Sequence, residues 1–274
     1  MADQRPPDVS SRQNPRFKAT LALRDTRERR ARGRILVDGA REIGRALDAG
    51  LVPTEAWIAP ESVRSEAARA LLPRLATSTD AIETTPELLA RLAYGERDEG
   101  IVAVFEVPRT DLQRVVASLR ERPLVAVVEG VEKPGNLGAL LRSADGAGVD
   151  AIIVADAVSD VWNPNAIRAS LGTIFSLPLA TSRSAEALAF LREHDIAVYA
   201  ARVEGATAYD AVDLTGAAAL VVGAETSGLS ATWSGQDVQA ISIPMLGRAD
   251  SLNVSASAAV LLYEARRQRR AAGR

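Results

Sequence analysis

The fold is decided by residues 124–156, which read LVAVVEGVEKPGNLGALLRSADGAGVDAIIVAD. The apolar runs at 124–131 and 151–156 are rich in Val, Ile and Ala, as is typical of strands buried on both faces of a parallel sheet. Residues 136–147 between them have the Ala- and Leu-rich pattern of a helix. A strand, a helix and a second strand in this order predict a βαβ unit, and therefore a parallel α/β sheet.

The same alternation continues on both sides of this stretch. Downstream we expect strands at 196–201, 218–225 and 240–244, and helices at about 164–171, 184–193 and 252–270. Upstream we expect strands at 35–39, 55–59, around 82 and at 101–107, and helices at 14–32, 40–49, 62–72 (ended by Pro73) and 86–93. Residues 108–123 are charged and have no strand pattern. We therefore predict a smaller N-terminal α/β domain (1–107), a linker (108–123) and a C-terminal parallel-sheet domain (124–274).

Composition excludes several kinds of chemistry. The chain has 274 residues, no Cys and one His, with 47% hydrophobic and 25% charged residues. Disulfides, a thiolate nucleophile and a Cys/His zinc site are excluded, and we expect no metal. A Ser-His-Asp triad would need His194, which lies in the polar run LREHD at a predicted helix end. Catalysis is therefore left to Arg, Asn, Ser, carboxylates, backbone amides or an organic cofactor.

The charge is unevenly distributed although the net charge is only −2. Residues 1–45 hold 12 basic and 6 acidic side chains, and residues 264–274 hold 5 basic and 1 acidic. A basic head and tail on an acidic body are typical of contact with a polyanion, and the candidate residues in the head are Arg24, Arg27, Arg30 and Arg34. A solvated arginine-rich helix is the equally weighted alternative. No apolar run reaches ~18 residues and the first residues are polar, so we expect a cytoplasmic protein.

Three glycine-marked junctions follow apolar strands. In the first, VEGVEKPGNLGALLRSADGAGV (128–149), Asn136 and Arg142 lie on the predicted helix, and neither GxGxxG nor a Walker loop occurs. In the second, LVVGAETSGLS (220–230), Gly223 permits close backbone approach of a ligand, while Glu225 fits either a ligand site or a helix start. In the third, ISIPMLGRADSLNVSASAAVLLYEA (241–265), Ser251 or Asn253 fits a helix N-cap.

Taken together, NLGALLRSADGAG, VVGAETSGLS and SIPMLGRADSLNVSASAAV resemble the three motifs of the SpoU-type RNA 2′-O-ribose methyltransferases of the SPOUT superfamily. The resemblance covers about residues 124–270. The head SRQNPRFKATLALRDTRERRARGRILVDGAREIGRAL also resembles the start of that family's N-terminal RNA-recognition domain. The segment YAARVEG (199–205) is less typical of the family, so cofactor contacts there stay open.

The resemblance implies S-adenosylmethionine as cofactor, a C-terminal trefoil knot and an obligate homodimer in which the neighbouring subunit completes each site. It implies RNA as substrate, with 23S ribosomal RNA favoured. Carried over position by position, the family's cofactor contacts fall on Gly223, Ile243 and Leu252. Its polar site residues fall on Asn136, Arg142, Glu225, Ser251 and Asn253. Antibiotic resistance, known for some relatives, is neither favoured nor excluded.

The chemistry of such a transfer can be argued separately. A ribose hydroxyl is a weak nucleophile, so the enzyme must align it with the methyl donor and stabilise the charge that develops on O2′. Arg142 suits charge stabilisation, and it is no general base because guanidinium stays protonated. Transfer-RNA methylation and an inactive RNA-binding paralogue remain alternatives, whereas an NAD-dependent oxidoreductase is disfavoured by the missing GxGxxG.

Overall fold

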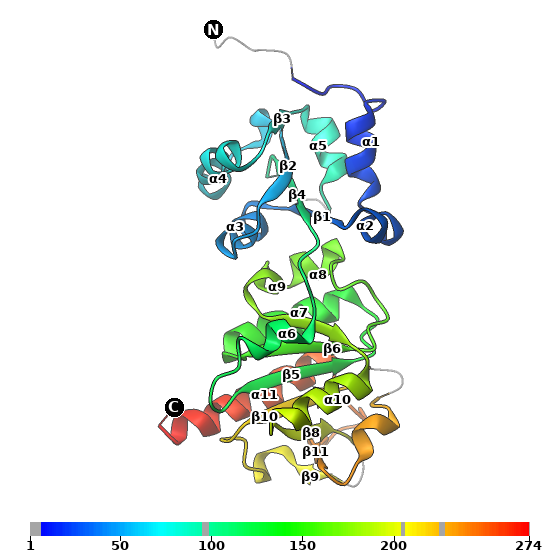
Figure 1. The fold of residues 1–274 in the computed structure, drawn as a ribbon, viewed down its shortest axis with the longest axis vertical. Helices are drawn as coiled ribbons and strands as arrows, with labels where there is room; N and C mark the ends of the chain where they lie inside the picture. Colours follow the sequence, from blue (N-terminus) through cyan, green and yellow to red (C-terminus); the bar gives the residue numbers. More distant parts are fainter. Residues whose placement is uncertain (1–6, 95–98, 204–205, 225–227, 274) are drawn as a thin grey trace. The chain divides into compact units, whose positions relative to one another are not determined.

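The computed structural model describes residues 7–94, 99–203, 206–224 and 228–273. The chain forms two compact units, and each combines one sheet with helices (Figure 1). The first unit is Met1–Pro108 with Trp162–Ser176, and the second is Arg109–Val161 with Leu177–Arg274.

The second unit is built on a parallel sheet of seven strands among the described residues, in the order β7-β6-β5-β10-β8-β11-β9. The strands are β5 (Leu124–Glu129), β6 (Ala151–Ala155), β7 (Leu179–Ser182), β8 (Ala197–Ala201), β9 (Thr207–Ala208), β10 (Ala218–Val222) and β11 (Val238–Ser242). Every pairing is parallel, which confirms the predicted α/β class. The sequence did not indicate β7 and β9, because runs of four and two residues are too short to show a hydrophobic period.

Helices cover both faces of this sheet. They are α6 (Leu112–Val116), α7 (Pro134–Ala147), α10 (Ser184–Glu193) and α11 (Val254–Ala271), with 3₁₀ turns η2 (Tyr209–Ala211) and η3 (Ala231–Ser234). Val125, Val127 and Val221 belong to one core cluster with residues of α6 and α10. Alternate residues of the same strands point to the opposite face. There α7 and α11 pack on each other, and α11 contacts β10.

The C-terminal helix is fastened by an arginine. Arg269 donates hydrogen bonds to the carbonyl oxygens of Leu214 (3.0 Å), Arg122 (2.7 Å), Pro123 (3.1 Å) and Gly216. These carbonyls lie in or beside the segments that lead into β5 and β10. Part of the basic charge of residues 264–274 is therefore used inside the protein.

The first unit has a mixed sheet in the order β1-β4-β2-β3. Its strands are β1 (Arg34–Asp38), β2 (Pro53–Ile58), β3 (Ala81–Glu83) and β4 (Ile101–Glu106), and β4 runs antiparallel to β1 and β2. Its helical elements before residue 108 are α1 (Pro15–Ala22), α2 (Thr26–Arg32), α3 (Ala40–Asp48), η1 (Pro60–Ser62), α4 (Glu66–Ser78) and α5 (Pro86–Leu92). Phe17 packs edge-on against Trp57 in its core, with ring centroids 6.1 Å apart.

Two helix predictions in this unit were wrong. The single helix expected over 14–32 is split, because the Asp25 side chain caps α2 by accepting from the Arg27 N–H at 2.8 Å. The buried Arg29 side chain then binds the carbonyls of Leu23 and Arg24, both at 2.9 Å, at the end of α1. The second error is at Pro73, which lies inside α4 instead of ending it.

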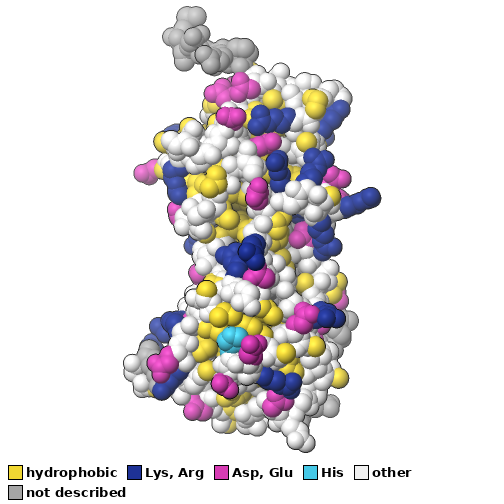
Figure 2. Space-filling model, viewed as in Figure 1, with side chains coloured by type: hydrophobic (Ala, Val, Ile, Leu, Met, Phe, Trp, Pro, Cys, Tyr) yellow, Lys and Arg dark blue, Asp and Glu magenta, His cyan; other side chains and the backbone are white. Residues whose placement is uncertain are grey.

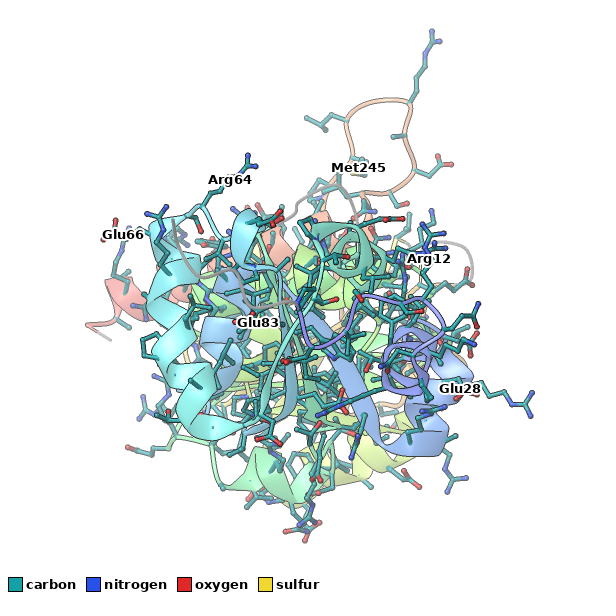
Figure 3. All side chains as sticks on the ribbon, turned by 90° about the horizontal axis from the view of Figure 1, so that it is seen from above. Arg12, Glu28, Arg64, Glu66, Glu83 and Met245 are labelled. Carbon is teal, nitrogen blue, oxygen red and sulfur yellow. The ribbon has the colours of Figure 1, made fainter. Side chains whose placement is uncertain are left out.

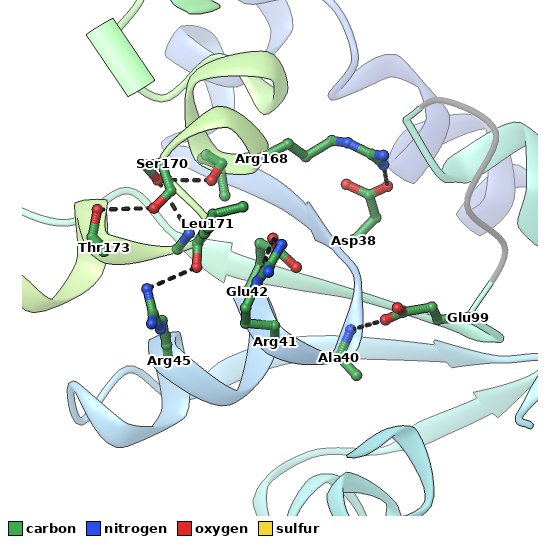
Figure 4. Close-up of polar contacts among 12 residues, drawn as sticks. Asp38, Ala40, Arg41, Glu42, Arg45, Glu99, Arg168, Ser170, Leu171 and Thr173 are labelled. Atoms are coloured by element: carbon green, nitrogen blue, oxygen red, sulfur yellow. Dashed lines mark hydrogen bonds and ion pairs between the residues drawn. The ribbon is translucent and has the colours of Figure 1, made fainter. Parts of the chain in front are cut away.

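The crossover between β6 and β7 is grouped with the first unit. It contains α8 (Pro164–Ala169) and α9 (Thr173–Ser176), and Figure 4 shows its polar contacts. The Arg168 guanidinium binds the Asp38 carboxylate at 2.5 Å and also the Tyr94 carbonyl, while Arg45 donates to the Leu171 carbonyl at 3.0 Å. The predicted division at residues 107 and 124 had placed this segment in the C-terminal domain.

Candidate functional site

A cavity of about 380 Å³ opens where three neighbouring strands of the parallel sheet end. β10, β8 and β11 are adjacent and parallel, so their carboxyl ends meet at one edge, where open α/β sheets bind ligands. The lining residues come from the loops after these strands and from the start of α11: Ala201, Arg202, Val203, Val222, Gly223, Ala224, Gly228, Ile243, Met245, Asp250, Ser251, Leu252, Val254 and Ser257. The volume and the mixture of apolar side chains with a few polar groups suit a small organic molecule.

Gly223 shapes this cavity through a backbone contact. A Cβ placed on Gly223 would lie 2.4 Å from the carbonyl carbon and oxygen of Gly228 and 2.7 Å from the Leu229 nitrogen. The Gly228 N–H also donates to the Ala224 carbonyl at 2.9 Å. The sequence led us to expect that Gly223 allows a ligand to approach. The structure shows instead that it allows the returning segment of its own chain to approach.

A buried carboxylate, which the sequence analysis missed, anchors this returning segment. The Glu129 carboxylate, at the end of β5, accepts from the Ser184 hydroxyl (2.5 Å), the Ser230 N–H (2.7 Å), the Ser230 hydroxyl (2.7 Å) and the Trp233 indole N–H (3.0 Å). Burial raises the pKa of Glu129, but these hydrogen bonds favour the charged form more strongly, so the pKa lies below its ordinary value of 4.5. An acidic residue within the apolar run LVAVVEGV was the available signal.

We expect Glu129→Gln to destabilise the protein by about 1–3 kcal/mol at pH 7, because the Gln NH₂ group must face a donor that the carboxylate now accepts from. The stabilisation from the carboxylate is complete above the unfolded-state pKa, and it is lost as the pH falls through the lower folded-state pKa. The difference between the variant and the wild type should therefore shrink below about pH 4.5. Urea unfolding of both proteins at pH 7 and pH 4 measures this. An equal difference at both pH values would contradict the assignment.

The third junction supplies the side of the cavity next to α11. Ile243, Ser251 and Leu252 all line the cavity. Asn253 is the N-cap of α11, and its side-chain oxygen accepts from the Ser255 N–H at 3.0 Å and the Ser255 hydroxyl at 2.6 Å. For Asn253 the N-cap alternative is therefore confirmed. For Ser251 the structure places the residue at the cavity and does not make it the N-cap.

The remaining predicted polar residues do not line this cavity. Asn136 lies half-buried in the first turn of α7, and Arg142 is exposed one and a half turns further along the same helix. Glu225 lies outside the described residues. All three predicted cofactor residues, Gly223, Ile243 and Leu252, thus meet at one cavity, whereas Arg142 projects from another part of the unit.

The arginines proposed for RNA differ in their surroundings. Arg24 donates to the Arg91 carbonyl at 2.7 Å and lies 4.8 Å from the Tyr94 ring centroid, so part of its binding capacity serves the fold. Arg27, Arg30 and Arg34 are exposed. In Figure 2, Lys and Arg side chains gather on the side of the first unit where Figure 1 shows α1 and α2.

His194 has a local structural role. It follows α10, its Nδ1 lies 2.9 Å from the Phe190 carbonyl oxygen, and its ring packs on the Phe190 ring at 4.4 Å. Within the described ranges, no group of three or more His, Asp or Glu side chains is placed to hold a metal ion. No helix in those ranges combines the length and apolar character needed to span a membrane.

Comparison with known proteins points in one direction. A model described as the SpoU rRNA Methylase family matches residues 123–263, and one described as an MRM3-like substrate binding domain matches residues 14–103. A 23S rRNA (uridine(2479)-2′-O)-methyltransferase of Streptomyces viridochromogenes is 35% identical over 95% of this chain and 92% of its own. The crystal structure of the SpoU methyltransferase AviRb from Streptomyces viridochromogenes, in complex with AdoMet, has a TM-score of 0.86 and 34% identity, covering 94% of this chain and 98% of that one. A structure described as an RNA 2′-O ribose methyltransferase has a TM-score of 0.83 and 37% identity, covering 95% of this chain and 98% of that one.

Proposed function

Because the chain belongs to the SpoU rRNA methylase family, we propose that it transfers the methyl group of S-adenosylmethionine to a ribose 2′-hydroxyl of 23S ribosomal RNA. The observation that carries this proposal is the cavity at the ends of β8, β10 and β11, where Gly223, Ile243 and Leu252 meet. An AdoMet-bound relative aligns over nearly the whole chain, which supports the same cofactor here. We place this activity in the cytoplasm.

The cavity suits this cofactor. Val222, Ile243 and Leu252 offer apolar contacts, and the backbone groups at strand ends can bind an adenine or a carboxylate. When bound, S-adenosylmethionine supplies an electrophilic methyl group. Ser251 at the cavity and Asn253 beside it orient the reacting ribose, and we assign Glu225 and Asn136 to the same polar site.

Arg142 reaches a cavity, in this proposal, through a homodimer. Arg142 and Gly146 are four residues apart and share one face of α7. A Cβ on Gly146 would lie 2.7 Å from the Tyr263 hydroxyl, so the half-exposed Tyr263 of α11 lies over this face. A second copy covering the α7–α11 surface would bury Tyr263 and bring its own Arg142 to this chain's cavity. There the guanidinium stabilises charge on O2′ and holds the adjacent phosphate. We also propose that residues of the C-terminal unit form the family's trefoil knot.

The first unit is proposed to recognise RNA, with the domain division 1–107, 108–123 and 124–274. A family model described as a substrate-binding domain matches residues 14–103 and supports this. Arg24, Arg27, Arg30 and Arg34 contact phosphate groups. Phosphate contacts hold the RNA in register without reading its sequence.

The experiment that tests the function is methyl transfer from radiolabelled S-adenosylmethionine to transcribed 23S rRNA. Mapping of 2′-O-methyl sites in cellular RNA with and without the gene then identifies the nucleotide. Methylation of transfer RNA alone would assign the other substrate class. Binding of both RNA and S-adenosylmethionine without transfer would identify an inactive paralogue.

The double charge reversal Arg27→Glu and Arg30→Glu should weaken RNA binding and reduce the slope of log K against log salt by about two, because about one counterion is released per phosphate contact. Arg114→Glu with Arg122→Glu provides a control of equal charge change at exposed positions of the second unit. Filter binding at several salt concentrations measures the slope, and calorimetry measures the affinity for S-adenosylmethionine, which should not change. Equal loss of RNA affinity in both double variants would place the RNA elsewhere.

A further inference from the structure

The loop between β11 and α11 presents an uncovered leucine to solvent. Leu246 is 99% exposed, far more than any other large apolar side chain of the described residues. No hydrogen bond joins residues 244–251 to another described residue. In Figure 3 the chain beside Met245 forms a loop that stands out from the ribbon. The fold therefore does not use the Leu246 side chain.

This loop is continuous with the cofactor cavity. Met245 on one side of the tip, and Asp250 and Ser251 on the other, all line the cavity. Arg248, at the tip, is exposed. The positive charge is thus at the tip, while the carboxylate of Asp250 lies at the cavity end. A surface that combines one apolar side chain with one guanidinium matches a nucleotide, which has an apolar base face and an anionic phosphate.

We infer that Leu246 contacts the RNA substrate by packing against the base of the target nucleotide when that base leaves its stack, and that Arg248 binds a neighbouring phosphate. This inference rests on the proposed function. The reacting ribose oxygen must come within about 3–3.5 Å of the transferred methyl group, so the target nucleotide enters at the mouth of the cavity, beside this loop. Extracting a nucleotide from folded RNA breaks its stacking, and an inserted apolar side chain compensates for that loss.

A second copy of the chain is the other occupant to consider. The surface proposed above for dimer formation lies on α7 and α11, where Tyr263 is exposed, and the loop belongs to neither helix. The guanidinium at the tip also favours a polyanion over a protein surface. RNA is therefore the occupant that the chemistry of the loop supports.

The test compares Leu246→Ser with the conservative control Leu246→Met in the full-length protein. After the methylated nucleotide has been mapped, two RNA fragments are used: one with the natural sequence, and one with abasic sites on both sides of the target nucleotide. Leu246→Ser should lower kcat/KM on the natural fragment by about 10- to 100-fold, which corresponds to the loss of one leucine contact. On the abasic fragment, where stacking is already removed, the loss should fall below about threefold. Leu246→Met should behave as the wild type on both fragments.

Other outcomes separate the possibilities. A wild type that binds S-adenosylmethionine but methylates no 23S rRNA overturns the proposed function, and this inference with it. Normal wild-type activity with an unaffected Leu246→Ser, or an equal loss on both fragments, overturns this inference alone. A change in oligomeric state on size exclusion, or a weaker affinity for S-adenosylmethionine in Leu246→Ser, assigns the loop to the dimer or to the cavity and also overturns it.

Discussion

Arg142→Ala should lower kcat for methyl transfer by about 10²- to 10³-fold, while the affinities for S-adenosylmethionine and RNA change little. The size follows from removing one preorganised donor at the position where charge develops in the transition state. Arg142 is exposed on α7 and is not used by the fold, so the variant should remain folded. Arg142→Lys keeps the charge but loses the bidentate geometry, and it should recover only part of the activity. Single-turnover kinetics with excess enzyme isolate the chemical step.

The position of Arg142 outside the cavity of its own chain gives this prediction a second arm. Arg142→Ala and a cavity variant, Ser251→Trp, should each be inactive alone, the second because the indole fills the cavity that Ser251 lines. If Arg142 acts on the neighbouring subunit, mixing the two proteins restores one intact site in each heterodimer, or about one quarter of the wild-type activity. If Arg142 acts within its own chain, the mixture stays inactive. Near-normal turnover of Arg142→Ala alone would remove this residue from catalysis.

The sequence predicted the parts of the fold that follow from local patterns. Continuous apolar runs identified β5, β6, β8, β10 and β11, because each is buried on both faces of the sheet. The crossover at 162–176 was predicted only as a helix. Its grouping with the first unit depends on contacts between residues far apart in sequence, such as Arg168 with Asp38. No period within the segment contains that information.

The candidate site was predicted to a similar extent and for similar reasons. The three motifs identified the residues that meet at the cavity, including Gly223 and Leu252. They did not show that Gly223 is required by the chain's own backbone, or that Glu129 holds the returning segment through Ser230. Both facts depend on how two loops approach each other in space. A buried carboxylate with four donors is visible only once its partners are placed.

Gly223→Ala should lower the affinity for S-adenosylmethionine by more than about 100-fold and destabilise the protein by about 3 kcal/mol or more. The added Cβ would lie 2.4 Å from two backbone atoms of Gly228, and backbone cannot rotate away as a flexible side chain can. The neighbouring Ser230 is also held by Glu129 through two hydrogen bonds of 2.7 Å, which limits how far this segment can shift. The cavity wall must therefore deform.

Gly216→Ala is the matched control for this substitution. It lies in the same unit just before β10, and a Cβ there would meet nothing within 4 Å. Its backbone carbonyl, which accepts from Arg269, is unchanged by the substitution. Gly216→Ala should therefore keep the wild-type melting temperature and affinity in thermal unfolding and calorimetry. Binding of S-adenosylmethionine by Gly223→Ala within about threefold of wild type would mean that the segment after Gly228 yields. The tight return of the chain against β10 would then not be what forms the cavity.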